Sequence, residues 1–291
     1  MRILMVPVAN RPECVAAMRT TFNLARRLGA CIQACHVRPH RYSAVVLPPE
    51  AAFALSDQAV QEAADRAEES AKQAANEARQ MVDDMANDAG FSVVRRIRGG
   101  TDDGVVWSEQ VGDPQHLMRV IGPFSDLLVV SRPSNKRSYK ARQFLEAALL
   151  DSSRPVLVLP PRGARSVGER VVIAWDRTHN AMLAVIAAMP ILQKAESVTV
   201  LTSGHGKEDG PKASRLVAYL SAWGIDAEHV QTRGARANPV KDIDATCEKA
   251  KADLLVMGSY SRSRLRERIF GGVTEHMLNN TKRPILTIHN G

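Results

Sequence analysis

The sequence lacks the most familiar nucleotide-binding signatures and has no long apolar run. The P-loop pattern GxxxxGK[ST] does not occur, and no GxGxxG pattern follows the first strand-like segment of either half. No segment reaches the roughly 18 apolar residues that a membrane span requires. The first apolar segment, Arg2–Val8, is too short for a secretory signal and is typical of a strand. We therefore expect a cytoplasmic protein that does not contact a membrane.

Cysteine is also scarce, and none of the four cysteines belongs to a CxxC pair. Cys31 and Cys35 flank a predicted strand close to His36 and His40, which leaves a metal site open as an alternative. Buried thiols in a reducing compartment explain the same residues more simply, so we predict no metal ligands. His, Asp and Ser side chains do not gather at any predicted strand end, and we predict no catalytic residue.

Aromatic residues make up only 4% of the chain, while the net charge is +8. Most of the positive excess lies in residues 162–291. The basic residues there are not interleaved with aromatic ones and follow no nucleic-acid-binding motif, so we expect no nucleic-acid partner. A local excess of positive charge indicates a site for a small anion instead, with a solvated basic loop as the alternative.

Strand-like and helix-like segments alternate along the whole chain, which is the pattern of an α/β protein with parallel strands. The predicted strands cover 2–8, 30–37, 91–97, 127–131, 155–159, 170–174, 197–201, 227–231, 254–257 and 284–289. The predicted helices cover 12–28, 57–87, 114–121, 144–150, 180–192, 213–223, 239–250 and 273–279. Asp113-Pro114 and Asn238-Pro239 each place a capping side chain before a proline at the first helical position.

An internal repeat is visible in the second part of each half. The segment DLLVV at Asp126 matches DLLVM at Asp253. The segment SRPVLV at Ser153 matches KRPILT at Lys282. The chain therefore contains two copies of one strand–helix–strand arrangement.

The stretch between the two copies, residues 160–169, reads PPRGARSVGE and has the composition of a linker. The sequence thus predicts two tandem Rossmann-like α/β domains, residues 1–161 and 169–291. Each is expected to have a five-stranded, mainly parallel sheet flanked by helices.

The most informative stretch is Asp253–Thr274. It begins as a buried strand, Leu254–Met257, ends that strand at Gly258, continues as a basic loop and enters a helix through Gly271-Gly272. A parallel strand that leaves the sheet through glycine into a helix is where open α/β proteins bind ligands. Free backbone N–H groups at such a turn favour phosphate. Four arginines lie between the glycines: Arg262, Arg264, Arg266 and Arg268.

This stretch resembles the universal stress protein family, whose motif G-x2-G-x9-G-[ST] lies between a strand and a helix and precedes a last strand that begins R-P. Here the pattern reads Gly258-x2-Ser261-x9-Gly271-Gly272, followed by Val273-Thr274. Ser261 replaces the second glycine, and Gly272 replaces the Ser/Thr. The resemblance extends over the whole chain as a tandem pair. It implies the adenine nucleotide alpha hydrolase-like form of the Rossmann-like fold.

In that family the motif binds the ribose and phosphates of ATP in the members that bind it, and an acidic residue follows the first strand. Asp176 matches this position, beside Trp175; the alternative roles are a helix cap for Asp176 and core packing for Trp175. Thr202 stands where an apolar residue lines the adenine. The resemblance therefore implies a C-terminal site for ATP or another adenine nucleotide, with or without Mg²⁺. Its implied residues are Ala174, Asp176, Thr202, Gly258, Ser261, Arg262, Gly271, Gly272, Val273 and Thr274.

The corresponding loop of the first half, Ser131–Glu146, departs further from the motif. It contains no glycine, Pro133 removes an N–H donor, and Glu146 adds negative charge. We interpret the first domain as degenerate in its nucleotide motif and structural in role. In the family, last strands commonly pair edge to edge, which here implies pairing of Val156–Leu159 with Ile285–His289.

We therefore expect a ligand-responsive, universal stress protein-like module that binds ATP through its C-terminal domain and is not a fast enzyme. Two alternatives remain open. One is an interaction scaffold that binds no nucleotide, and the other is a weak ATPase, which needs a positioned water and a metal. The two domains would form an intramolecular pair, a homodimer remains an option, and a protein partner is unknown.

Overall fold

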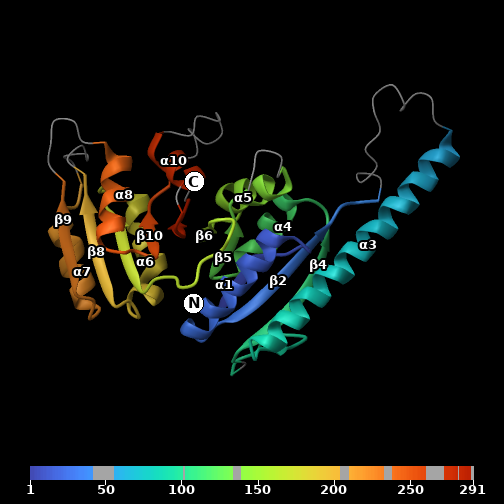
Figure 1. The fold of residues 1–291 in the computed structure, drawn as a ribbon, viewed down its shortest axis with the longest axis horizontal. Helices are drawn as coiled ribbons and strands as arrows, with labels where there is room; N and C mark the ends of the chain where they lie inside the picture. The colour runs from blue at the N-terminus through green and yellow to red at the C-terminus, as the bar shows by residue number, and fades with distance from the viewer. Residues whose placement is uncertain are drawn as a thin grey trace.

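The computed structural model describes residues 1–41, 56–100, 102–133, 139–203, 210–232, 238–259, 272–280 and 282–289. Within these ranges the strands form one eleven-stranded sheet, with the order β3-β4-β2-β1-β5-β6-β11-β10-β7-β8-β9 (Figure 1). The strands of the first half are β1 (Ile3–Pro7), β2 (Cys31–Arg38), β3 (Ser92–Val93), β4 (Gly104–Val111), β5 (Leu127–Ser131) and β6 (Val156–Leu159). Those of the second half are β7 (Arg170–Ala174), β8 (Ser197–Thr202), β9 (Ala227–Gln231), β10 (Leu254–Met257) and β11 (Ile285–Thr287).

The helices follow the predicted alternation. In the first half they are α1 (Pro12–Leu28), α3 (Asp57–Asp88), α4 (Pro114–Val120), the short 3-10 helix η2 (Gly122–Phe124) and α5 (Tyr139–Asp151). In the second half they are α6 (His179–Leu192), α7 (Ala213–Ala222), α8 (Pro239–Lys249) and α10 (Gly272–Asn280). The fold is therefore the predicted α/β arrangement of two Rossmann-like halves.

All neighbouring strands are parallel except β6 and β11, which run antiparallel with Leu157 opposite Leu286 at the centre of the pair. This pair joins the strands of the first half to those of the second. The pairing that the family resemblance implied for the last strands is thus confirmed. As a consequence, neither of these two buried strands is left as an open sheet edge.

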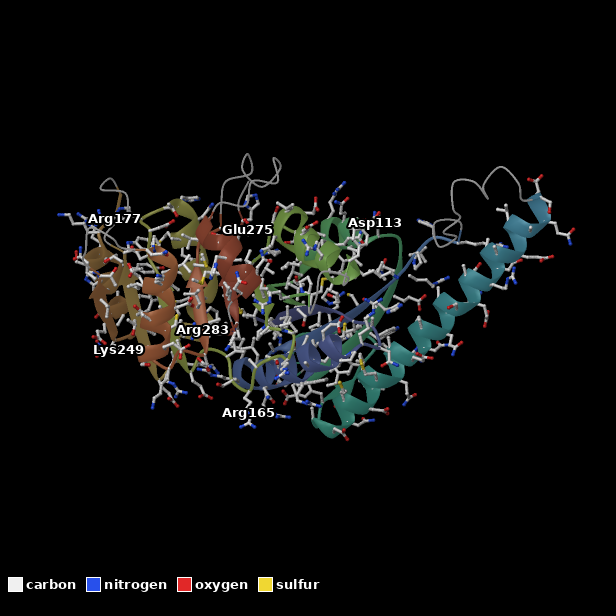
Figure 2. All side chains as sticks on the ribbon, turned by 45° about the horizontal axis from the view of Figure 1, so that its top comes forward. Asp113, Arg165, Arg177, Lys249, Glu275 and Arg283 are labelled. Carbon is white, nitrogen blue, oxygen red and sulfur yellow. The ribbon has the colours of Figure 1, made fainter. Side chains whose placement is uncertain are left out.

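Helices cover both faces of the sheet. Along β1, Leu4 and Val6 belong to a core under α1, α3, α6 and α7, while Met5 belongs to a second core under α4, α5, α8 and α10. This alternation is what a strand buried on both faces requires. Charged side chains such as Arg165 and Lys249 are exposed and point away from the sheet (Figure 2). None of the helices in the described ranges is both long enough and apolar enough to cross a membrane.

The predicted helix over 57–87 is confirmed as α3, which extends well beyond the sheet (Figure 1). The Ser56 hydroxyl caps it by accepting a hydrogen bond from the N–H of Ala59 at 3.3 Å. Its buried residues are small or medium in size: Ala64, Ala75, Ala78, Val82 and Ala86. Small side chains let this helix lie close to β2 and β4.

One strand prediction was wrong in detail. The segment 91–97 forms only the two-residue strand β3, and the longer strand is β4, which had been assigned to no element. β4 pairs with β2 from Val105 opposite Ile32 to Val111 opposite Arg38. Its outer part carries polar residues because β3 covers only its beginning, so its hydrophobic pattern is weak.

The two Asx-Pro caps are confirmed. The Asp113 carboxylate accepts a hydrogen bond from the N–H of His116 at 2.8 Å, at the start of α4. The Asn238 side-chain oxygen accepts from Val240 at 3.0 Å and from Lys241 at 3.4 Å, at the start of α8. Both side chains satisfy N–H groups that the first helical turn leaves without partners.

The aspartates of the two repeated DLLV segments have the same structural role. Asp126 accepts hydrogen bonds from the N–H groups of Arg2 and Ile3, at 2.6 and 2.9 Å, where β1 begins. Asp253 accepts from the three consecutive N–H groups of residues 168–170, at 2.9 to 3.1 Å, where β7 begins. In each half, this carboxylate therefore holds the start of the first strand, β1 or β7, beside the strand that follows the aspartate, β5 or β10.

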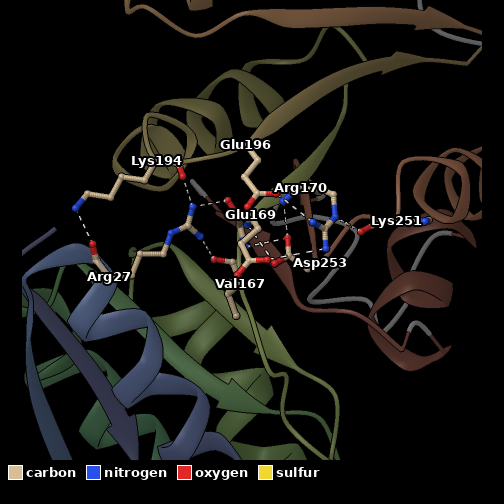
Figure 3. A network of polar contacts seen from close by, with 9 residues as sticks. Arg27, Val167, Glu169, Arg170, Lys194, Glu196, Lys251 and Asp253 are labelled. Carbon is tan, nitrogen blue, oxygen red and sulfur yellow. Dashed lines mark hydrogen bonds and ion pairs between the residues drawn. The ribbon is translucent and has the colours of Figure 1, made fainter. Parts of the chain in front are cut away.

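Arg27, at the end of α1, connects the two halves (Figure 3). Its guanidinium donates to the carbonyl oxygens of Val167 at 2.5 Å and Gly168 at 2.9 Å, and to that of Lys194. Lys194 donates in return from Nζ to the carbonyl oxygen of Arg27 at 2.6 Å. The first half is thus hydrogen-bonded both to the linker and to the turn after α6.

We predict that Asp253→Ala lowers the free energy of unfolding by about 1–3 kcal/mol, because it leaves three N–H groups at the start of β7 without their acceptor. Urea denaturation followed by circular dichroism measures the change. The control is Asp226→Ala, since Asp226 is an exposed aspartate in the turn before β9. Equal losses for both variants would show that the Asp253 hydrogen bonds do not stabilise the fold.

A second prediction concerns acid stability. Burial of the Asp126 carboxylate raises its pKa. The hydrogen bonds from Arg2 and Ile3, together with the charges of the N-terminal amine and Arg154, lower it by a larger amount, so the pKa lies below its ordinary value. Such a group stabilises the fold above its unfolded pKa and loses this contribution as the pH falls through the folded pKa. Between about pH 5 and pH 3, wild type should therefore lose more unfolding free energy than Asp126→Asn. Urea titrations at each pH test this; parallel losses would contradict it.

Candidate functional site

A cavity of about 220 Å³ lies at the carboxyl ends of β7, β8 and β10. The chain passes from β7 to β8 and β9 on one side and places β10 on the other, so the cavity lies where the strand order reverses. Open α/β sheets bind ligands at this position. The lining residues are Ala174, Trp175, Asp176, Leu201, Ser203, Pro239, Ile243, Met257, Gly258, Ser259, Val273 and Thr274.

Gly258 ends β10 against the first turn of α6. A Cβ at this position would lie 2.6 Å from the backbone N of Ala181 and 2.9 Å from the carbonyl carbon of Asn180, so only glycine fits. The Asn180 side chain donates to the carbonyl oxygen of Ser259 at 2.7 Å and fixes the chain directly after the strand. Close packing of strand and helix therefore shapes this corner of the cavity.

Asp176 is exposed and lies two residues after the end of β7. Its Oδ1 accepts hydrogen bonds from the N–H of Thr178 at 3.0 Å and from the Thr178 hydroxyl at 2.6 Å. Thr178 in turn caps α6 by accepting from the N–H of Ala181 at 3.2 Å. Asp176 thus supports the helix start through Thr178, while its Oδ2 has no hydrogen-bond partner within the described part of the chain.

Trp175 has the packing role that the sequence analysis considered. Its side chain is 3% exposed, and its indole N–H donates to the carbonyl oxygen of Pro211 at 3.0 Å. The indole is therefore part of the wall that holds the turn before α7, rather than a surface free to move onto a ligand.

Thr202 does not line the cavity. It is buried, and its hydroxyl lies 2.9 Å from Nε2 of His229 on β9. The residues before and after it, Leu201 and Ser203, line the cavity instead. The prediction for Thr202 was wrong by one position. Successive side chains of a strand point to opposite faces, so Leu201 faces the cavity and Thr202 faces away from it.

The structure brings five of the other predicted residues together in the lining: Ala174, Asp176, Gly258, Val273 and Thr274. Gly272 begins α10 and is exposed, outside the lining. Ser261, Arg262 and Gly271 lie outside the described residues. The predicted anion contacts of the basic loop are therefore still predictions.

Asp242, which the sequence analysis did not single out, organises the far side of the cavity. Its Oδ2 accepts hydrogen bonds from the hydroxyl of Ser203 at 3.2 Å and from that of Thr232 at 2.7 Å. The carboxylate on α8 thus connects the segment that follows β8 with the segment that follows β9. The sequence signal was an acidic residue in the first turn after the Asn238-Pro239 cap.

The cysteines that left a metal site open, Cys31 and Cys35, are both buried, and Cys35 belongs to the core under α4, α5, α8 and α10. The Cys35 sulfur lies 2.8 Å from the hydroxyl oxygen of Ser108, and burial raises the pKa of this thiol to about 11. Across the described ranges, no group of three or more His, Cys, Asp or Glu side chains is arranged to hold a metal ion. Cys35 is therefore a protonated, hydrogen-bonded core residue at neutral pH.

Fold and cavity together define a repeated Rossmann-like α/β protein with a cavity at the strand reversal. Residues 169–289 match the model of the universal stress protein family. The universal stress protein MJ0531 of Methanocaldococcus jannaschii is 32% identical over 95 residues, which are 32% of this chain and 54% of that protein. This chain thus spans about half the length of the curated relative that it matches.

Two solved structures share the fold over nearly the whole chain. A universal stress protein from Archaeoglobus fulgidus DSM 4304 has a TM-score of 0.69 at 19% identity, with 99% of this chain and 98% of that chain covered. A functionally unknown protein from Pseudomonas aeruginosa PAO1 has a TM-score of 0.51 at 14% identity, with 99% and 92% covered. The match to the universal stress protein family thus covers residues 169–289, and the likeness to the solved structures extends the same fold over nearly the whole chain.

We predict that Gly258→Ala destabilises the protein by about 1–3 kcal/mol, because the added methyl group meets the backbone of α6 and cannot be relieved by a side-chain rotation. The thermal midpoint of unfolding measures this change. Gly99→Ala is the matched control, since a Cβ at Gly99 meets nothing within 4 Å. If the two variants lose the same stability, the close approach at Gly258 is not what requires glycine.

Proposed function

We propose that the C-terminal half binds an adenine nucleotide, ATP foremost, and that the protein is a ligand-responsive stress-response module of the cytoplasm. The observation that carries this proposal is the cavity at the strand reversal. It brings together Gly258 of the family motif, Val273 and Thr274 directly after that motif, and Asp176 at the acidic position after the first strand of the domain. In this proposal the N-terminal domain, residues 1–161, is the structural partner of the domain at 169–291.

The size of the cavity suggests how the nucleotide divides between the cavity and its surroundings. At about 220 Å³ it is smaller than the roughly 300–1,000 Å³ typical of sites that enclose a whole drug-sized ligand. We therefore assign the base and ribose to the cavity, with Leu201 and Ile243 against the base. Asp176 Oδ2 accepts a hydrogen bond from a ribose hydroxyl in this arrangement.

The phosphates then extend towards the start of α10. The N-terminal N–H groups of a helix and its dipole favour a negative charge there. Glu275 in the first turn opposes such a charge, so the arginines of the preceding basic segment supply the balance. Any Mg²⁺ in this proposal is held mainly by the phosphates and not by the protein, since Asp176 is the only carboxylate among the described lining residues.

Binding without rapid turnover follows from the same residues. Phosphoryl transfer to water needs a positioned nucleophile and, in most enzymes, a metal held by the protein. One oxygen of Asp176 is already engaged by Thr178. We therefore propose a role for the nucleotide in shifting shape or partner affinity, not as a substrate.

The test is calorimetric titration of the nucleotide-free protein with ATP and Mg²⁺. Wild type should bind with an affinity of about 1 μM, which corresponds to about 8 kcal/mol. Ser203→Trp, which fills the cavity from the end of β8, should weaken binding by about tenfold or more. Gly271→Val tests the predicted phosphate turn in the same way. The control is Asn76→Trp on the exposed face of α3, far from this cavity.

The proposal is contradicted if titration of the wild type gives no heat of binding after mass spectrometry has excluded co-purified nucleotide. The replacement of glycine by Ser261 and of Ser/Thr by Gly272 would then have closed the site to ATP, and the interaction scaffold would be the better reading. Binding by the wild type that survives both Ser203→Trp and Gly271→Val would place the nucleotide elsewhere.

A further inference from the structure

The first half contains a second cavity, which is larger than the one in the second half. Its volume is about 400 Å³, within the range of small-molecule sites. It lies at the carboxyl ends of β1, β2 and β5, where the strand order of the first half reverses. One wall comes from α3, through Ala67, Ala71 and Ala74. The cavity is therefore built from the fold itself and not from a single loop.

The walls are mainly apolar. They include Val8 and Ala9 after β1, Val37 in β2, Val130 in β5 and Phe144 in α5. The alanines of α3 leave space here because their side chains end at Cβ. Such a surface favours a ligand that is itself largely apolar, because burial of apolar area supplies most of the binding free energy.

The charged side chains around this cavity balance one another. Arg11 and Lys140 are matched by Glu13 and Glu77. Glu13 lies in the first turn of α1, where it offsets the positive end of the helix dipole. With neither a charge excess nor a glycine turn after β5, the cavity offers little to a triphosphate.

Three polar side chains at the cavity are already engaged, namely Asn10, Glu77 and Ser131. The Asn10 side-chain amide donates to Glu77 at 3.4 Å, and the Ser131 hydroxyl donates to the carbonyl oxygen of Glu13 at 3.1 Å. A ligand therefore gains few new hydrogen bonds from these three side chains, which again favours an apolar molecule.

His36 is the buried polar side chain of this cavity. Its side chain is 7% exposed and stacks on Trp107 with a centroid distance of 5.9 Å. Its Nδ1 lies 2.9 Å from the carbonyl oxygen of Val8, which can only accept, so Nδ1 carries the proton. Desolvation by burial lowers the pKa of His36, and the ring is neutral near pH 7. Nε2 is then an acceptor, and it has no hydrogen-bond partner within the described part of the chain.

We propose that this cavity of the first half binds an uncharged, mainly apolar small molecule, of about one to three rings, that donates one hydrogen bond to His36 Nε2. The two halves then bind ligands of different chemical classes at topologically equivalent positions. The first half is a ligand-binding domain in its own right, in addition to its part in the common sheet.

The probe for the test is phenylnaphthylamine, an uncharged aromatic amine with one N–H donor whose fluorescence rises in apolar surroundings. Its anionic counterpart, anilinonaphthalene sulfonate, has the same ring skeleton and an added sulfonate. Fluorescence titration should show saturable one-site binding of the neutral probe to the full chain. The sulfonate should bind about tenfold more weakly or not at all.

Ala71→Trp fills the cavity from α3 and should weaken binding of the neutral probe by about tenfold or more. Asn76→Trp adds the same side chain to the opposite face of α3 and should leave binding unchanged. Circular dichroism checks that both variants are folded, and Ala67→Phe replaces Ala71→Trp if the latter fails to fold. Titration of Ala71→Trp with ATP separates the two sites, since only the neutral probe should be affected.

Three results would overturn this inference: no saturable binding of the neutral probe, equal affinity for the sulfonate, or no effect of the cavity-filling variants. Displacement of the probe by ATP would also overturn it and would assign the first cavity to a nucleotide. The ATP experiment on the second half has its own variants, so either proposal can fail without the other.

Discussion

The antiparallel contact between β6 and β11 is the constraint on which the rest of the structure depends. Both strands are short and fully buried, and without each other both would present unpaired N–H and C=O groups at a sheet edge. Their pairing merges two half-sheets into one, and the core under α1, α3, α6 and α7 then runs through both halves without a break. The two halves are therefore parts of a single hydrophobic structure, held further by Arg27 and Lys194.

The position of both cavities follows from the strand order inside each half. In each half the first strand lies between the second and the fourth principal strand, and this reversal leaves the loops at the carboxyl ends diverging from one another. The difference between the cavities comes from side chains rather than from topology. Glycine and Asp176 shape the second cavity, whereas the alanines of α3 and the balanced charges around Glu13 and Glu77 shape the first.

Much of the fold could be predicted from the sequence, because alternating buried strands and amphipathic helices give strong periodic signals and because Asx-Pro caps mark helix starts. β4 was missed since its outer residues are polar and its apolar positions depend on β2 beside it. Within the site, the glycine-bounded motif located Gly258, Val273 and Thr274. Leu201 and the Asp242 network could not be predicted, because a strand's exact register and contacts between distant segments are set by tertiary packing.

The segment 160–169, finally, determines how the two halves find each other. Because it joins β6 to β7 directly, each half meets its partner at an effective concentration fixed by chain length and not by the amount of protein in solution. Dilution therefore cannot separate the halves, in contrast to a pair of single-domain subunits that associate by the same strands. Because the two halves differ in sequence and are joined in one chain, the cavity of the first half can differ from that of the second while the shared strand pair stays intact.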